Sequence, residues 1–141
     1  MPSPNNRPND LRRRTFDFAL AVIELTESLP KSRTADVIGR QLLRAGTSVG
    51  ANYRSVKRAQ SLAHMVSKLS LVEEEADECG YWVELLRMRD LVAPERAAAL
   101  EREASELTAI MVASKKTLRA QARTSARRSS RFVVPGSDGE S

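Results

Sequence analysis

The side chains with the greatest potential for chemistry lie in one acidic run, residues 73–78 (EEEADE), which the chain's single cysteine, Cys79, follows directly. Carboxylates inside a helical bundle can hold two iron ions, but such sites also need a Glu-x-x-His motif on each of two helices. The chain has one histidine, His64, and no Glu-x-x-His motif. We therefore expect no metal site and no cofactor, with most of the run facing solvent and one or two members paired with arginines.

Nucleophilic catalysis has equally little support. Cys79 falls on an apolar helical seam, where cysteine behaves as a small core residue. His64 would have to act alone, so no Ser-His-Asp set is indicated, and no glycine-rich phosphate loop follows a predicted strand. The sequence therefore predicts no catalytic residues and a protein that is not an enzyme.

A second polar group lies upstream of the acidic run. Arg44, Ser48 and Asn52 are four residues apart and would share one strip of a helix. If the chain folds back near residues 57–60, Arg44 lies opposite Glu74 or Glu75, and a buried arginine needs such a partner. Two interpretations remain open. These residues and Glu78 form a polar network that fixes helix register, or they simply reach solvent at the edge of the seam.

The C-terminal region is strongly basic. Seven cations and no acid occur within residues 115–131: Lys115, Lys116, Arg119, Arg123, Arg127, Arg128 and Arg131. Such clusters neutralise phosphates and give salt-sensitive, sequence-independent binding to nucleic acid. Only Phe132 is nearby to stack on a base, so base recognition is not indicated. The alternative is a solubilising tail. Arg12, Arg13 and Arg14 form a second, shorter basic cluster.

The net charge of +5 belongs to the two ends of the chain. Residues 15–114 hold twelve Lys/Arg against fifteen Asp/Glu, a net of −3. Residues 1–14 hold four arginines against one aspartate, and residues 115–141 hold seven cations against two acids. The body of the protein is therefore expected to be mildly acidic, with RNA or DNA contacts at the termini.

Apolar periodicity predicts an all-α fold, an antiparallel up-down-up-down four-helix bundle. The predicted helices cover residues 10–29, 34–56, 61–91 and 94–120, within a bundle of residues 10–118. Disordered basic tails are expected at residues 1–9 and 121–141. The regular seams of the third and fourth helices run from Leu62 to Leu86 and from Ala97 to Leu118.

The first two helices are less regular. The first is expected to bury Phe16, Leu20 and Ile23, with Val22 and Leu29 as further candidates. The second has a heptad-like seam on which Asn52 lies, and it begins after Thr34 as its N-cap. Gly46 and Gly50, one turn apart, favour close approach of another helix over a loosened helix end.

A second apolar stripe on the third helix suggests self-association. Its members are Leu71, Tyr81, Trp82 and Leu85. One cysteine allows no internal disulfide, and no apolar run approaches the roughly 18 residues of a membrane span. The N-terminal segment lacks the apolar core of a signal peptide. We therefore expect a cytoplasmic homo-oligomer without membrane contact.

The motifs LLRAGTSVGANYR (residues 42–54) and KLSLVEEEADECGYWVELL (residues 68–86) resemble a known family. It is the bacterial four-helix bundle family encoded in intervening sequences of large-subunit ribosomal RNA genes. The segment from Glu106 to Lys116 also fits, and the resemblance covers roughly residues 14–118.

This resemblance implies a small antiparallel bundle that assembles into a homopentameric ring without known enzymatic activity. It also implies kinship with accessory bundles of diversity-generating retroelements, which bind a reverse transcriptase and carry a basic surface for nucleic acid. Because the body here is net −3, the arginine-rich ends are the expected counterpart of that surface. A structural or adaptor ring that binds only another protein is the alternative.

Overall fold

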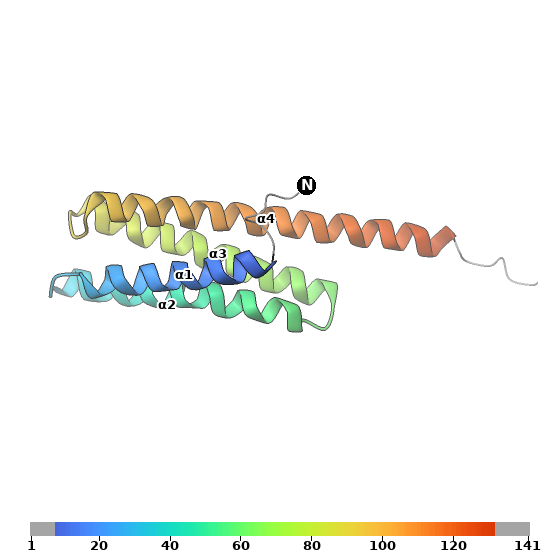
Figure 1. The fold of residues 1–141 in the computed structure, drawn as a ribbon, viewed down its shortest axis with the longest axis horizontal. Helices are drawn as coiled ribbons and strands as arrows, with labels where there is room; N and C mark the ends of the chain where they lie inside the picture. Colours follow the sequence, from blue (N-terminus) through green and yellow to red (C-terminus); the bar gives the residue numbers. More distant parts are fainter. Residues whose placement is uncertain (1–7, 132–141) are drawn as a thin grey trace, which may run out of the picture.

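The structure, a computed structural model, describes residues 8–131 and contains four α-helices and no strand in that range. Each helix runs back along the preceding one in Figure 1. The predicted all-α class is confirmed. The elements are α1 (Pro8–Glu27), α2 (Arg33–Ser55), the short 3-10 helix η2 (Val56–Arg58), α3 (Leu62–Met88) and α4 (Pro94–Arg131).

Local sequence signals set the helix starts. The Ser61 hydroxyl caps α3 by accepting a hydrogen bond from the His64 amide at 3.1 Å, and Pro94 opens α4, in agreement with the predicted starts at residues 61 and 94. The α2 cap differs, because Ser32 rather than Thr34 accepts from the Ala35 amide. Ser32 has the extended backbone of an N-cap residue, whereas Thr34 already lies inside the helix.

The core follows the predicted seams of α3 and α4. The α3 residues Leu69, Val72, Ala76, Cys79, Val83 and Leu86 are buried, as are the α4 residues Ala97, Leu100, Ala104, Leu107 and Met111. The seam frays at its ends, since Leu62 is 38% exposed. These two helices make the most extensive contacts in the bundle, whereas α1 and α4 make few.

The expected core face of α1 was wrong in part: Val22 is buried and Leu29 packs against the core, but the main predicted residues do not form the buried face. Phe16 and Leu20 are 46% and 50% exposed, and the buried apolar face is formed by Leu11, Phe18, Val22 and Leu25. Apolar residues occur on two sides of this helix, so periodicity alone does not select between them. The polar Thr15 lies on the buried side, where its hydroxyl donates to the Arg12 carbonyl.

Close packing of α1 on α2 depends on glycine. A Cβ at Gly46 would lie 2.7–2.9 Å from side-chain atoms of Val22, and one at Gly50 would lie 3.4 Å from the backbone of Thr15. The expectation that these glycines permit close helix approach is therefore confirmed. Val22 occupies the space that a side chain at position 46 would need.

The largest correction concerns the C-terminal region. The sequence predicts a tail from residue 121, but α4 continues to Arg131 and projects beyond the rest of the bundle (Figure 1). We call residues 119–131 the α4 extension. The apolar rhythm does fade here, but alanine, arginine and glutamine are strong helix formers that continue a helix without a core face. The N-terminal tail predicted at residues 1–9 is also too long, because α1 begins at Pro8. Residues 1–7 and 132–141 lie outside the described residues.

Candidate nucleic-acid interface

The α4 cations form a row along one side of the helix. Lys116, Arg119, Arg123, Arg127 and Arg131 are spaced three or four residues apart, which keeps them within about 120° of the helix circumference. Every one of them is exposed. The row lies away from the buried α4 face, so the guanidinium groups project into solvent. Arg128 is also exposed but lies beside the row.

Lys115 does not belong to this surface. Its ammonium donates to Glu73 at 3.0 Å and to the Ser70 hydroxyl at 3.1 Å, both on α3, and its side chain is only 14% exposed. Lys115 therefore ties α4 to α3. One member of the acidic run is paired with a cation in this way, although that cation is a lysine.

The three N-terminal arginines divide in a similar way. Arg14 is partly buried and bridges α1 to α4 through Glu103 and Glu106, which raise its pKa despite burial. Arg13 pairs with Asp17 at 3.2 Å along its own helix. Arg12 is exposed and faces the end of α2. Only Arg12 and Arg13 remain on the surface at which α4 leaves the bundle.

The fold adds three more cations to this surface. In the sequence they fall within residues 15–114, whose net charge is −3. Arg54 lies in the last turn of α2, and Lys57 and Arg58 lie in η2; all three are exposed. The antiparallel arrangement brings this turn to the end of the bundle from which the α4 extension projects (Figure 1). A local signal existed, since residues 54–58 read RSVKR. The net charge of −3 over one hundred residues concealed it.

We call the surface formed by Arg12, Arg13, Arg54, Lys57, Arg58 and the α4 row the basic end. Aromatic residues occur within it. The Arg54 guanidinium carbon lies 5.7 Å from the centre of the Phe16 ring, within the range of a cation–π contact. Tyr53 is half-buried beside it, and burial raises the pKa of its phenol.

The predicted polar network on α2 and α3 exists in reduced form. Arg44 donates to Glu78 Oε1 at 2.9 Å, and the indole of Trp82 donates to the same oxygen at 3.1 Å. Arg44 also lies 3.8 Å from Glu75, too far for a hydrogen bond. Its own side chain is 54% exposed, so the arginine covers the network from the solvent side.

Glu75 is the member of this network whose hydrogen-bonding capacity is not satisfied. One carboxylate oxygen is buried without a hydrogen-bond partner among the described residues. Burial raises the pKa of Glu75, Arg44 opposes that rise, and the negative charges of Glu78 and Glu74 reinforce it.

The remaining expected members contribute less. Glu74 is exposed, and within the described part of the chain it forms no ion pair. Ser48 donates to the Arg44 carbonyl of its own helix. Asn52 is half-buried and makes no side-chain hydrogen bond to another described residue. The ion pairs between α2 and α3 are therefore made by Arg44 with Glu78 and Glu75 rather than by the whole strip, and a role in fixing helix register stays a prediction.

Cys79 is fully buried beneath this network, and burial together with Glu75 and Glu78 raises the pKa of its thiol to about 12. A thiol with such a pKa is not a nucleophile at neutral pH. Among residues 8–131, no group of three or more His, Cys, Asp or Glu side chains could hold a metal ion. In the same range, no helix has the length and apolar character needed to cross a membrane.

The residues expected at an oligomer interface lie in two environments. Tyr81 and Leu71 are 55% and 37% exposed, while Trp82 and Leu85 are partly buried within the monomer. Tyr81 contacts Trp82 edge-on, with ring centres 5.0 Å apart.

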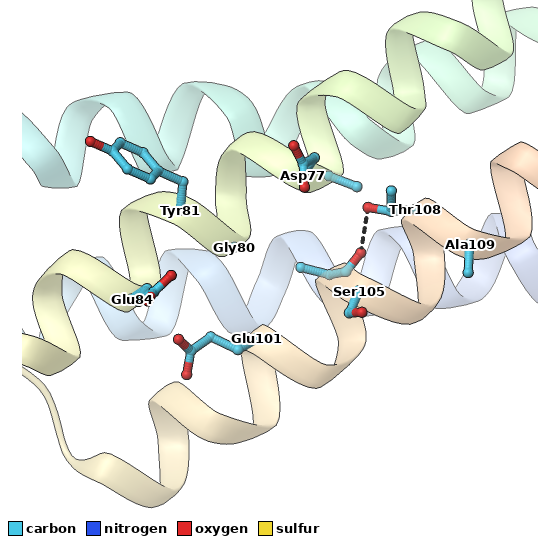
Figure 2. Close-up of a pocket in the computed structure, with 10 residues that line it drawn as sticks. Asp77, Gly80, Tyr81, Glu84, Glu101, Ser105, Thr108 and Ala109 are labelled. Carbon is cyan, nitrogen blue, oxygen red and sulfur yellow. Dashed lines mark hydrogen bonds between the residues drawn. The ribbon is translucent and has the colours of Figure 1, made fainter.

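Tyr81 also borders a groove of about 640 Å³ between α3 and α4. Figure 2 shows Glu84 and Glu101 extending toward one another across it, with Gly80 and Ser105 on facing helices. Asp77 adds a third carboxylate to the rim. Arg87 holds Glu101 through hydrogen bonds of 2.9 and 3.2 Å.

Residues 7–113 match the model of a family described as 23S rRNA-intervening sequence proteins. A similar solved structure is a protein of unknown function from the S23 ribosomal protein family of Bacteroides thetaiotaomicron VPI-5482. Its sequence is 30% identical, the match covers 77% of this chain and 97% of that chain, and the TM-score is 0.71. No curated protein matches the chain. The family resemblance read from residues 42–54 and 68–86 is confirmed, while the kinship with retroelement proteins stays a prediction.

Proposed function

The chain belongs to the 23S rRNA-intervening sequence protein family, and from this premise we propose that it is a non-enzymatic, oligomeric bundle that binds nucleic acid, alone or within a nucleoprotein, through its basic end. The observation that carries this proposal is the convergence of two basic segments. The α4 row and the cations around Arg54 lie at the same end of a body whose overall charge is negative.

The geometry of the basic end suits a phosphate backbone. A straight α4 extension of thirteen residues reaches about 20 Å past the bundle, at 1.5 Å per residue. Its exposed cations repeat about every 6 Å along one side. Among the described residues, the cations of the α4 extension have no carboxylate partner, so they remain available to phosphates. In the rest of the basic end, only Arg13 is paired with a carboxylate of the described residues.

A non-enzymatic role fits the state of the reactive groups. The thiol of Cys79 is buried and protonated, and the carboxylates of the acidic run serve in ion pairs or face solvent. A homopentameric ring, as the family resemblance implies, would present five basic ends and increase avidity for one long strand. Such a ligand would place the protein in the cytoplasm.

The test is binding of a fluorescent mixed-sequence RNA and the equivalent DNA, measured by anisotropy across a salt series. We expect affinity to fall steeply with salt. The triple variant Arg119→Glu, Arg123→Glu, Arg127→Glu should lose most binding at 100 mM salt. The control is Arg33→Glu, Arg89→Glu, Arg102→Glu, which makes the same change in net charge at exposed sites outside the basic end.

Equal losses in the two triple variants would contradict a localised site. Absence of binding at low salt would favour the alternative, a structural or adaptor ring that binds another protein, such as a reverse transcriptase. One observation supports that alternative: the α3–α4 groove, with Tyr81 and three carboxylates on its rim, suits a basic protein segment. A pulldown dominated by one partner, abolished by Tyr81→Ala, would then be expected.

A further inference from the structure

Two adjoining hollows lie at the basic end. One, of about 260 Å³, lies between the start of α1, the end of α2 and the start of α3, and its lining is Arg12, Tyr53, Arg54, Val56, Lys57 and Met65. The other, of about 400 Å³, is lined by Arg12, Arg13, Phe16 and Arg54. Both therefore share two arginines. No carboxylate among the described residues lines either one.

The first hollow combines a cationic rim with an apolar interior. Three positive side chains, from Arg12, Arg54 and Lys57, surround the ring of Tyr53 and the apolar Val56 and Met65. Such a site accepts a flat or apolar group that carries a negative charge next to it. A nucleotide has this composition, because its base is flat and its phosphate is anionic.

The second hollow offers a stacking surface. The Phe16 ring is exposed, and the guanidinium carbon of Arg54 lies 5.7 Å from its centre. Aromatic rings and arginine planes are the surfaces on which unpaired bases stack. Because Arg12 and Arg54 border both hollows, a phosphate held between them would join a base in one hollow to a base in the other.

We propose that these two hollows bind consecutive unpaired nucleotides of a single strand, with a phosphate between Arg12 and Arg54. This inference rests on the proposed function, since it assigns a substrate class to the same basic end. Paired bases in a duplex are stacked on their neighbours and held by their partner strand, so they are not free to enter these hollows, and the site distinguishes single strands from duplexes. The α4 row, by contrast, contacts phosphates alone.

The test uses the full chain and three fluorescent probes at one salt concentration. These are a single-stranded oligonucleotide, its duplex, and a strand of the same length without bases. We expect the single strand to bind at least tenfold more tightly than the abasic strand, and more tightly than the duplex. Stacking of one base contributes about 1–3 kcal/mol, which corresponds to roughly 5- to 150-fold in affinity.

Phe16→Ser should reduce single-strand affinity about fivefold or more and leave abasic-strand affinity unchanged. Leu20→Ser is the matched control, because Leu20 is a similarly exposed apolar residue one turn along α1 that lines neither hollow. Tyr53→Leu tests the first hollow while keeping its apolar volume, and its melting curve shows whether the bundle remains folded.

The outcomes separate the two proposals. Equal binding of all three probes would overturn the single-strand site and leave phosphate binding by the basic end intact. Absence of binding to every probe would overturn both. Displacement of the strand by poly-glutamate at matched charge, as effectively as by unlabelled strand, would reassign the hollows to an acidic peptide and also overturn the inference.

Discussion

At the residue scale, small differences in side-chain environment decide the roles of chemically identical groups. Three glutamates of one acidic run have different environments. Glu73 pairs with Lys115, and Glu75 has a buried carboxylate oxygen without a hydrogen-bond partner among the described residues. Glu78 accepts hydrogen bonds from both Arg44 and Trp82. Their positions in the sequence determine which face of α3 each glutamate occupies. Their ion-pair partners come from α2 and α4, so the pairing depends on how those helices pack against α3.

Gly46 provides the clearest test of the α1–α2 contact. Gly46→Ala should destabilise the protein by about 1–3 kcal/mol, because the new Cβ would overlap Val22. This loss exceeds the gain of about 1 kcal/mol from better helix propensity. The measurement is urea unfolding followed by circular dichroism.

Two further variants control this experiment. Gly80→Ala adds the same methyl group where the nearest atom is 3.7 Å away, so stability should stay equal or rise by up to about 1 kcal/mol. Val22→Ala should offset part of the Gly46→Ala loss, with a coupling of at least about 0.5 kcal/mol. Equal effects at positions 46 and 80 would rule out steric overlap as the cause.

Glu75 makes stability depend on pH. Because its pKa is raised in the folded state, the folded protein binds more protons than the unfolded chain between the usual pKa of about 4.3 and the raised value. Stability therefore falls as pH rises through that window. Glu75→Gln should unfold at higher urea concentration than the parent at pH 7, and this advantage should vanish below about pH 4.

The exposed neighbour serves as the control. Glu74→Gln should change stability by less than about 0.5 kcal/mol at either pH, as expected for a surface site. If Glu75→Gln lowers stability at pH 7, the attraction to Arg44 outweighs the cost of burying the carboxylate.

At the element scale, α4 performs two tasks in succession. Its first part packs against α3 through Ala97, Leu100, Ala104, Leu107 and Met111, and its second part carries the cationic row without a core face. Packing stabilises the first part, whereas propensity and the continuity of an already formed helix stabilise the second.

A proline should separate these tasks. Ala122→Pro removes a helical hydrogen bond and places its ring against the Leu118 carbonyl, which costs about 3 kcal/mol locally. Thermal stability of the bundle should change little, because the α4 extension lies largely outside the core. Helix content measured by circular dichroism should fall, together with affinity for RNA.

Ala122→Gln keeps a good helix former at this position and should preserve both properties. Full RNA affinity in the proline variant would show that a continuous rod is unnecessary and that the cations act as a flexible chain. A large fall in melting temperature would instead place the extension in the cooperative unit of the bundle.

At the scale of the whole molecule, two surfaces of opposite charge are candidates for binding. The basic end combines the α4 row with the α2–α3 turn, while the α3–α4 groove presents three carboxylates. Exposed apolar side chains, including Tyr81 and Leu71, lie on the outer surface of the helices and are available for contacts between copies.

Light scattering tests the assembly. A homopentamer of 15.6 kDa chains would have a mass of about 78 kDa. Leu71→Lys with Tyr81→Lys should reduce this mass, because burying two cations at a subunit interface is costly. Val37→Lys, an exposed apolar residue outside the expected interface, is the control and should leave the mass unchanged. A 15.6 kDa species for the parent protein would exclude a stable ring.

The sequence by itself determined the fold class, the α3 and α4 seams, the glycine contact and the family, because these depend on local propensity and long periodic patterns. The α1 core face could not be read, since Phe16 and Leu20 compete with Phe18 and Val22 on a helix with two apolar sides. Tertiary structure alone decided which cations are engaged and which face solvent. It engaged the partly buried Lys115 and Arg14 in ion pairs and brought Arg54 and Lys57 beside Arg12. Such groupings depend on which ends of antiparallel helices meet, and charge counted along the chain does not contain that information.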